Sequence, residues 1–466
     1  MIYANLFKRA GSRHIRAGLI GTGSYGISLL AQAQLLSRLE IPVVCDRNPE
    51  TAQSACRLAG IPAEKITICN SRKKLLHAME NGKCAIAENH TLLLNAPLDV
   101  IVECTGNPEA GARHAISAIR KGKHVAMVNK EADAVIGPIL HKLAVQSGVI
   151  YTPVDGDQHG LLIGLVTWAH SLGLDVVCGG KARPVDFIYD ESAGTVTDGQ
   201  IIVRLPKDAL AALQIIRAGE AGLIVEKRRK ALKQLPQVGE PDLCELVIAA
   251  NATGLGVDTP SLHAPIVRTT EIPEALSPKE EDGILSNRAV VEVITCLRRA
   301  DEAGLGGGVF IVFSCDRSDA WKFVKAKGLI TNQRGSCGVV YRPYHLLGVE
   351  TPVSILCAGL LNISTGSLNY KPRVDLIARA TCDIKAGTTI HAARTKQETA
   401  LLKPLIAPAK AAKDGNPLPL NMAYGNRIKV DVPAGTILTC EMLETPTESD
   451  LWTLRQEQDS EWMNKK

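Results

Sequence analysis

The chain has 466 residues, which is too long for one hydrophobic core and predicts roughly two to four domains. Its net charge of +5 is small and only 4% of its residues are aromatic, so a nucleic-acid partner is not expected. Lys and Arg are scattered except in the run at residues 227–230, which we expect to be a solvated helix face.

The cysteines and the apolar stretches bear on the compartment. The 13 cysteines stand singly, without a CxxC pair, which is typical of a reducing cytoplasm. Lys8 and Arg9 interrupt the N-terminal apolar residues, so no signal peptide is expected. The most apolar stretch, residues 160–180, divides into a helix-like half and a strand-like half. We therefore expect a soluble cytoplasmic protein with no membrane partner.

A glycine-rich turn between two strands is the most informative motif of the chain. Gly21, Gly23 and Gly26 follow a predicted strand in the GxGxxG spacing, a helix comes next, and a second strand ends at Asp46. The first glycine permits a tight turn, the second lets the backbone approach a pyrophosphate, and the third lets helix and strand pack closely. The motif therefore predicts a dinucleotide-binding Rossmann domain with NADH or NADPH as cofactor.

We expect the cofactor to be held by the turn and by three later strand ends. Asp46 is typical of a site that takes the ribose hydroxyls of NAD, whereas a neighbouring arginine such as Arg47 can take the extra phosphate of NADP. Both are present, so the choice stays open, with Asp46 slightly favouring NAD. The predicted cofactor-binding residues are Gly21, Thr22, Gly23, Ser24, Tyr25, Gly26, Asp46, Arg47, Thr105, Gly106 and Asn129.

The alternation of strands and helices continues to residue 154. Residues 98–106 are an apolar run typical of a buried parallel strand, and an Asn-Pro pair then starts a helix. A strand over residues 124–129 leads to Lys130, and one over residues 149–154 leads to Asp155. Because ligands bind at the carboxyl ends of strands in such sheets, these polar residues are expected to lie near the cofactor.

The residues at these strand ends include candidates for chemistry. Lys130 could transfer the hydroxyl proton of a substrate or stabilise a developing alkoxide. Asp155 and Asp157 could position substrate hydroxyls or hold a divalent metal, or they could only cap backbone amides in a turn. Lys181 lies in the Gly-Gly-Lys-Ala-Arg segment 179–183, which we expect to be an anion-binding loop or a surface turn. The predicted catalytic residues are Lys130, Asp155, Asp157 and Lys181, and the metal is unknown.

The region from residue 186 to about residue 341 carries no further catalytic signature. Residues 249–254 and 304–308 are expected to be turns beside a pocket, and the second of these leads into a buried strand.

The C-terminal part contains an internal repeat. The pattern Asp-[Ile/Val]-x-Ala-Gly-Thr-x-[Ile/Leu] occurs at residues 383–390 and at residues 431–438. Each copy predicts a glycine turn and a short strand. The segment between them at residues 403–416 is expected to be a mobile loop, and the polar tail beyond Thr447 to be helical or frayed.

Several of these segments resemble the homoserine dehydrogenase-like oxidoreductases that carry a C-terminal SAF domain. The resemblance rests on the glycine motif and on residues 103–106, 122–130 and 341–345, and it covers most of the chain. In homoserine dehydrogenases a similar Asn-Lys pair places its lysine in the active site, which implies that role for Lys130. Residues 131–138, 250–254 and 342–345 also resemble the 1-deoxy-D-xylulose 5-phosphate reductoisomerase-like enzymes.

These features together predict an α/β fold in three parts. They are an N-terminal Rossmann domain with a doubly wound parallel sheet (1–158), an α+β catalytic, substrate and dimerisation domain (159–371), and a small β-rich SAF-like module (372–466). The resemblance implies a homodimer and an NAD(P)-dependent oxidoreductase acting on a small polar, hydroxyl- or carbonyl-bearing substrate that could be phosphorylated. Two alternatives stay open: homoserine dehydrogenase-type activity, and a non-catalytic nucleotide-binding sensor or assembly factor that uses the SAF module.

Overall fold

The computed structural model describes residues 2–207, 209–237, 243–315, 318–367, 369–391 and 401–463. The chain forms two compact units, which are described separately below. Unit 1 comprises Met1–Gly160, Leu346–Leu402 and Lys410–Lys466, and unit 2 comprises Leu161–His345 and Lys403–Ala409. The third segment expected from the sequence, which holds the repeat, thus groups largely with the N-terminal part in unit 1.

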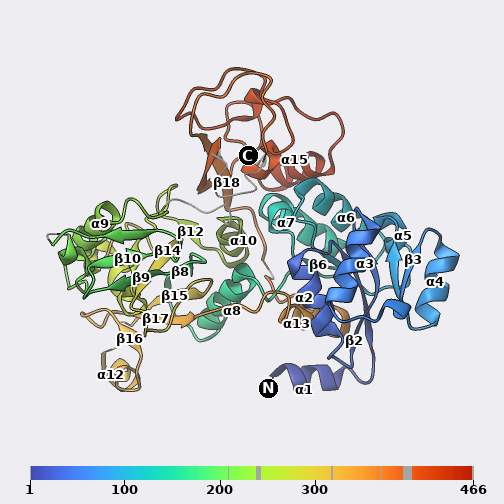
Figure 1. The fold of residues 1–466 in the computed structure, drawn as a ribbon, viewed down its shortest axis with the longest axis horizontal. Coiled ribbons are helices and arrows are strands. Elements are labelled where there is room, and N and C mark those ends of the chain that lie inside the picture. The colour runs from blue at the N-terminus through green and yellow to red at the C-terminus, as the bar shows by residue number, and fades with distance from the viewer. Residues whose placement is uncertain are drawn as a thin grey trace. The chain divides into compact units, whose positions relative to one another are not determined.

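Unit 1 is built on a parallel sheet of seven strands in the order β3-β4-β2-β1-β5-β6-β7. Strands β2, β3 and β6 of this sheet are labelled in Figure 1. The chain fills one side of β1 first and then the other, so the order reverses between β1 and β5, where doubly wound sheets bind ligands. The predicted Rossmann sheet is therefore confirmed. Its strands are β1 (Ile15–Ile20), β2 (Leu39–Cys45), β3 (Ile66–Cys69), β4 (Cys84–Ala87), β5 (Val100–Glu103), β6 (His124–Met127) and β7 (Tyr151–Pro153).

Several helices of unit 1 begin at side chains that cap their first turns. Asn107 accepts a hydrogen bond from the Ala110 amide at the start of α6, followed by proline as its pattern predicts. Asn48, Ser71, Asn89 and Asn129 cap α3, α4, α5 and α7. The helices are α1 (Ile2–Arg9), α2 (Ser24–Ala33), α3 (Pro49–Leu58), α4 (Arg72–Glu80), α5 (His90–Leu94), α6 (Pro108–Arg120), α7 (Lys130–Gln146), α13 (Thr351–Leu356), α14 (Leu420–Ala423) and α15 (Asp450–Trp462).

The two copies of the repeat form matching turns in unit 1, next to strand β18 (Val374–Ala380). Asp383 accepts a hydrogen bond from the Ala434 amide at 2.8 Å, and Asp431 accepts one from the Ala386 amide at 2.9 Å. Each aspartate therefore caps the turn of the other copy. The predicted mobile loop at 403–416 is wrong, because Leu402–Pro408 forms strand β19 and Ile406 donates to the Pro260 carbonyl within unit 2.

Unit 2 is a mixed sheet in the order β11-β10-β9-β14-β8-β15-β17-β16, with β12 and β13 also pairing with β14. Its core is made of apolar residues from β8, β14 and β15 packed on α9 and α11. The strands are β8 (Val176–Ala182), β9 (Phe187–Asp190), β10 (Thr195–Thr197), β11 (Ile202–Arg204), β12 (Gly256–Val257), β13 (Ile266–Val267), β14 (Val290–Arg298), β15 (Val309–Ser314), β16 (Ile330–Thr331) and β17 (Cys337–Arg342). The helices are α8 (Gln158–Ser171, which starts in unit 1), α9 (Ala221–Ala231), α10 (Cys244–Thr253), α11 (Ile272–Ala275) and α12 (Ser318–Ala326).

One sequence expectation in unit 2 is wrong, and a second is wrong at a single position. Residues up to Thr253 of the expected turn belong to α10, and only Gly254, with a φ of 88°, forms the turn that ends the helix. Within the basic run, Arg228 is fully buried, and its guanidinium forms two hydrogen bonds with Glu271 at 2.7 and 2.9 Å. The run is therefore a solvated face except at this one position.

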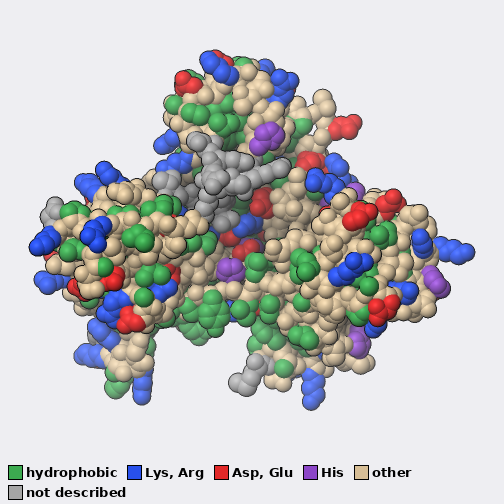
Figure 2. Space-filling model, in the orientation of Figure 1, with side chains coloured by type: hydrophobic (Ala, Val, Ile, Leu, Met, Phe, Trp, Pro, Cys, Tyr) green, Lys and Arg blue, Asp and Glu red, His purple; other side chains and the backbone are tan. Residues whose placement is uncertain are grey.

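Charged residues on the surface follow no single stripe on the face shown. Figure 2 shows Lys and Arg side chains spread among acidic and apolar ones. Within the described part of the chain, no helix has the length and apolarity needed to cross a bilayer.

Candidate functional site

A cavity of about 670 Å³ opens in unit 1 at the carboxyl ends of β1, β2, β4 and β5, on both sides of the reversal in strand order. Its position is the one where doubly wound sheets bind dinucleotides. The residues that line it are Ile20, Gly21, Thr22, Gly23, Cys45, Asp46, Arg47, Glu88, Asn89, His90, Cys104, Thr105, Asn107, Ala110 and His114.

The three glycines of the motif differ in what a side chain would meet. Gly21 has a φ of 98°, and a Cβ there would lie 2.6 Å from the Cys104 carbonyl. A Cβ at Gly26 would lie 2.7 Å from the Gly21 oxygen, so only glycine lets α2 pack on the turn. A Cβ added at Gly23 would meet no described atom within 4 Å beyond its chain neighbours, and Gly23 lines the cavity. These are the steric requirements that the motif predicts for a turn, a close helix and a free approach to a ligand.

The start of α2 suits an anion. Gly23 is the N-cap residue, and no described side chain caps this helix end. The first backbone N–H groups of a helix carry a positive partial charge and take phosphate oxygens well. The residues present therefore fit the diphosphate of a dinucleotide.

Asp46 and Arg47 lie at the end of β2 on the rim of this cavity. One carboxylate oxygen of Asp46 accepts hydrogen bonds from the Thr22 amide at 2.9 Å and from the Thr22 hydroxyl at 2.6 Å. These bonds hold the carboxylate at the glycine turn, whereas Arg47 is exposed. The structure thus fixes the position of the acid but not that of the arginine.

A buried acid–histidine pair, which the sequence analysis missed, lies beside the cavity, in which His114 lines the cavity and Glu103 lies behind it. Glu103 is fully buried, and its carboxylate lies 3.0 Å from His114 Nδ1 and accepts the Thr105 hydroxyl at 2.6 Å. The ring of His90 lies against His114 with centroids 4.7 Å apart. Burial, and then the neighbouring His114 and Arg113, lower the pKa of His90. The position of His90 just after β4 is the signal that could have revealed it.

Other predicted cofactor residues lie outside the lining of the cavity. Tyr25 packs in the core, and its hydroxyl bonds that of Thr351 at 2.5 Å. Asn129 is buried, caps α7 and donates to the Asn107 carbonyl at 2.8 Å. This hydrogen bond of the Asn129 side chain therefore links the turn after β6 to the turn after β5. Ser24, Gly26 and Gly106 also do not line it.

Lys130 is the first residue of α7 and is half-buried. It directly follows Asn129, whose side chain fixes the turn between β6 and the helix. Lys130 therefore follows the carboxyl end of β6, as expected, but it is not among the residues that line the cavity.

The loop with Asp155 and Asp157 follows β7 and is held from α13. The Asp155 amide donates to the Ser354 hydroxyl at 2.9 Å, and its carbonyl accepts the Thr351 hydroxyl at 2.9 Å. Asp157 is buried, and its carboxylate caps the Gln158 amide at 2.7 Å at the start of α8. Asp157 thus caps a backbone amide, which is the structural alternative considered for the pair. Among the described residues no group of three His, Cys, Asp or Glu could hold a metal ion.

Lys181 does not lie in a loop, so this expectation is corrected. It lies within β8, between β14 and β15, and it is fully buried. Its ammonium forms an ion pair with Glu245 of α10, which is also buried. A strand accommodates this lysine because a carboxylate from a distant part of the sequence compensates its charge.

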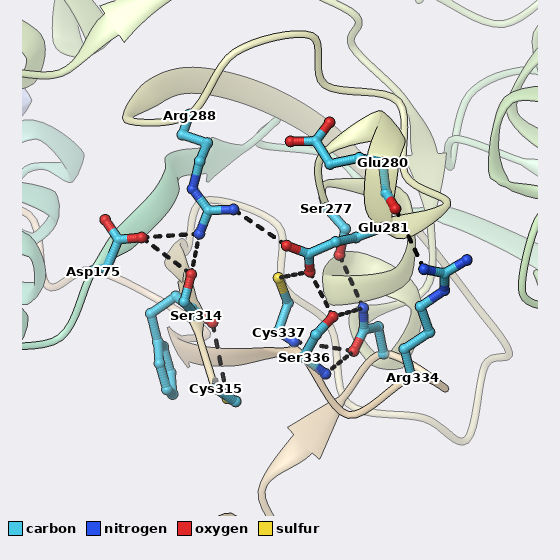
Figure 3. Close-up of polar contacts among 12 residues, drawn as sticks. Asp175, Ser277, Glu280, Glu281, Arg288, Ser314, Cys315, Arg334, Ser336 and Cys337 are labelled. Carbon is cyan, nitrogen blue, oxygen red and sulfur yellow. Dashed lines mark hydrogen bonds and ion pairs between the residues drawn. The ribbon is translucent and has the colours of Figure 1, made fainter. Parts of the chain in front are cut away.

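A second polar network of unit 2 is shown in Figure 3. Arg288 lies between Asp175, at 2.9 Å, and Glu281, at 3.2 Å. Burial alone would raise the pKa of Glu281, but hydrogen bonds from Ser336, Cys337 and Arg288 outweigh it and lower the pKa. Burial raises the pKa of the Cys337 thiol to about 12, so this cysteine is not a reactive thiolate. The network ties the segment before β14 to β15 and β17.

Two family models match the chain. The homoserine dehydrogenase NAD-binding domain matches residues 17–153, and the catalytic domain of the oxidoreductase DRL matches residues 239–351. The first contains the whole cavity, and the second lies in unit 2 apart from its last residues. Over these two segments the chain is similar to an NAD-binding domain and to the catalytic domain of an oxidoreductase, and the two matches together indicate an NAD(P)-dependent oxidoreductase.

Individual relatives are more distant. A 1-deoxy-D-xylulose 5-phosphate reductoisomerase of Chlorobium phaeovibrioides is 28% identical over 142 residues, which are 30% of this chain and 33% of the relative. The chain thus matches about a third of the length of that relative.

Solved structures show only slight similarity. The 1-deoxy-D-xylulose 5-phosphate reductoisomerase of Zymomonas mobilis in complex with NADPH is 21% identical. The match covers 37% of this chain and 46% of the reductoisomerase chain, with a TM-score of 0.28. The myo-inositol dehydrogenase of Lactobacillus casei in complex with NAD(H) and myo-inositol is 14% identical. That match covers 47% of this chain and 55% of the dehydrogenase chain, with a TM-score of 0.27.

Proposed function

We propose that this oxidoreductase transfers a hydride between NAD(P)H and a small polar substrate that carries a hydroxyl or carbonyl group. The observation that carries the proposal is the cavity at the reversal of strand order, which is lined by the turn that starts α2, a helix end that no described side chain caps. When bound, NAD(P)H would supply the hydride to a carbonyl carbon, and in the reverse direction NAD(P)+ would accept it from the carbon that bears the hydroxyl. The distant reductoisomerase relative makes phosphorylated sugars the first substrate class to test.

Lys130 is the residue to which we assign proton transfer. Its ammonium can donate a proton to a carbonyl oxygen or stabilise an alkoxide, and its amine can accept a hydroxyl proton in the reverse direction. Its place at the start of α7, next to the buried cap Asn129, supports this role. We assign substrate positioning to Asp155, whose backbone is fixed by Thr351 and Ser354.

A two-part experiment tests the proposal. Fluorescence titration with NADH and with NADPH should show binding of at least one, and purified protein should then turn over a member of a panel of sugar phosphates and hydroxy acids that includes 1-deoxy-D-xylulose 5-phosphate and homoserine. Lys130→Ala should lower turnover by about 10²-fold with little change in cofactor Kd. Lys73→Ala, at an exposed lysine of α4, is the control. Binding of neither dinucleotide would refute the proposal.

A further inference from the structure

Helix α7 contains a proline in its middle. Pro138 has no N–H group, and its ring disturbs the hydrogen bonds of the preceding turn. In a regular α-helix the next amide, Ile139 N–H, would donate to the Val135 carbonyl. Proline therefore weakens α7 at the place where its N-terminal half, which begins with Lys130, joins the remainder.

The carboxamide of Gln458 binds both of these backbone groups. Its Nε2 donates to the Val135 carbonyl at 3.0 Å, and its Oε1 accepts from the Ile139 amide at 3.2 Å. Gln458 lies on α15, which packs along α6 and α7 in unit 1 (Figure 1), and its side chain is buried. One side chain thus serves as donor and acceptor for the pair that proline disturbs.

Helix α15 is itself firmly held. Arg455 is fully buried and forms two hydrogen bonds with Asp375 of β18, at 2.7 and 2.8 Å, and one with Asp459 at 2.8 Å. At the start of the helix, the Asp450 amide and the Ser449 hydroxyl donate to Glu109 of α6. Gln458 therefore presents its carboxamide from a rigid support.

A second contact from the C-terminal part lies near the start of α7. Asn421 of α14 donates to the Glu131 carbonyl at 2.9 Å. The half-helix that begins with Lys130 is thus held near its start and at its proline. We propose that the C-terminal part of the chain positions Lys130 through these contacts, and that Gln458 is a positioning residue for the reaction proposed above.

The geometry gives the size of the effect. Lys130 lies eight residues before Pro138, or about 12 Å along the helix axis, so a tilt of about 10° at the proline moves Lys130 by about 2 Å. A displacement of about 1 Å at a reacting group can cost about 10²-fold in rate. Loss of the Gln458 contacts is therefore expected to lower kcat while the cofactor cavity, which α7 does not line, keeps its affinity.

The test uses Gln458→Met in the full-length protein, which keeps the side-chain volume but removes donor and acceptor. Gln456→Met, at an exposed position of the same helix, is the control. Amide hydrogen exchange of residues 130–137 should be about tenfold faster in Q458M than in wild type and unchanged in Q456M. The kcat should fall about tenfold or more, with NADH Kd within about twofold. Unchanged exchange, or a parallel loss of cofactor binding, would overturn the inference.

Two further measurements keep the test independent of folding and of turnover. Pro138→Ala restores the missing N–H, so the double variant P138A/Q458M should match P138A in hydrogen exchange and in kcat. A further fall in protection or in kcat in the double variant would contradict the proposed coupling between Gln458 and the helix break at Pro138. The pH dependence of Lys130 acetylation, followed by mass spectrometry in the protein without substrate, should shift in Q458M and not in Q456M. An absence of turnover in wild type would refute the proposed reaction alone, whereas unchanged exchange and acetylation would refute the positioning role alone.

Discussion

Asp133 lies one turn after Lys130 and is buried, with 1% of its surface exposed. The hydroxyls of Tyr151 and Tyr370 donate to the same carboxylate oxygen at 2.7 and 2.9 Å, and the other oxygen has no partner among the described residues. Burial raises the pKa of Asp133 to about 7, although both hydrogen bonds act to lower it. The folded state therefore holds a proton here that the unfolded chain releases near pH 4.

This bound proton predicts a dependence of stability on pH. Between about pH 4 and pH 7 the folded state binds more protons at Asp133 than the unfolded state does, so the contribution of this residue to the free energy of unfolding falls as the pH rises and is constant above about pH 7. The total decrease is about 4 kcal/mol at most. Asp133→Asn should remove this slope in urea unfolding curves, whereas the exposed Asp414→Asn should keep it. An unchanged slope in Asp133→Asn would show that the carboxyl is ionised throughout.

Asp46 predicts the choice of cofactor. Its carboxylate, fixed by Thr22, can accept ribose hydroxyls and repels a 2′-phosphate, so NADH should bind more tightly than NADPH. Asp46→Asn removes the charge and should raise NADPH affinity relative to NADH by about tenfold at low salt. The two Kd values from fluorescence titration give this ratio. Glu50→Gln, at an exposed acid of α3, is the control, and an unchanged ratio in Asp46→Asn would assign selectivity elsewhere.

At the scale of elements, the glycine turn predicts that two similar substitutions act differently. Gly23→Ala adds a methyl group on the cavity side, where no described atom lies within 4 Å, so it should weaken NADH binding about tenfold with little change in stability. Gly26→Ala places a methyl group 2.7 Å from a backbone oxygen and should cost about 1–3 kcal/mol in stability. Thermal unfolding and NADH titration of both variants separate the effects. Equal effects on stability would contradict this division of roles.

Elements determined by neighbouring residues could be predicted from the sequence. The strand, glycine turn and capped helices of unit 1 depend on local patterns, and residues 24–26 and 107–110 behave as these patterns require. Lys181 and Arg228 could not be predicted, because each is buried through a carboxylate that lies 64 or 43 positions away in the sequence. Local composition favours a surface position for such residues, and only the tertiary partner reverses that preference.

The candidate site shows the same limit. Sequence motifs indicate part of the cavity lining: Gly21, Thr22, Gly23, Asp46, Arg47 and Thr105. His90 and His114 also line the cavity, but they come from segments that carry no motif. The role inferred for Gln458 was equally hidden, since it depends on a proline in α7 that lies 320 positions earlier.

At the scale of the whole molecule, each unit has its own core and its own fully buried arginine. Arg455 is compensated by Asp375 and Asp459 in unit 1, and Arg228 by Glu271 in unit 2. Removing one partner of a buried ion pair leaves the other charge without compensation, which costs about 3–5 kcal/mol. Neither network uses residues of the other unit, so the loss of stability from removing either arginine should be confined to the unit that contains it.

Arg455→Met should therefore speed hydrogen exchange in peptides of unit 1, such as those from α7 and α15, while peptides from β8 and β14 of unit 2 keep their protection. Arg228→Met should produce the opposite pattern. Arg427→Met and Arg204→Met, at exposed arginines of units 1 and 2, are the matched controls and should resemble wild type. If either buried-arginine variant loses protection equally in both units, the chain unfolds as one cooperative body, and the separate cores do not define separate folding units.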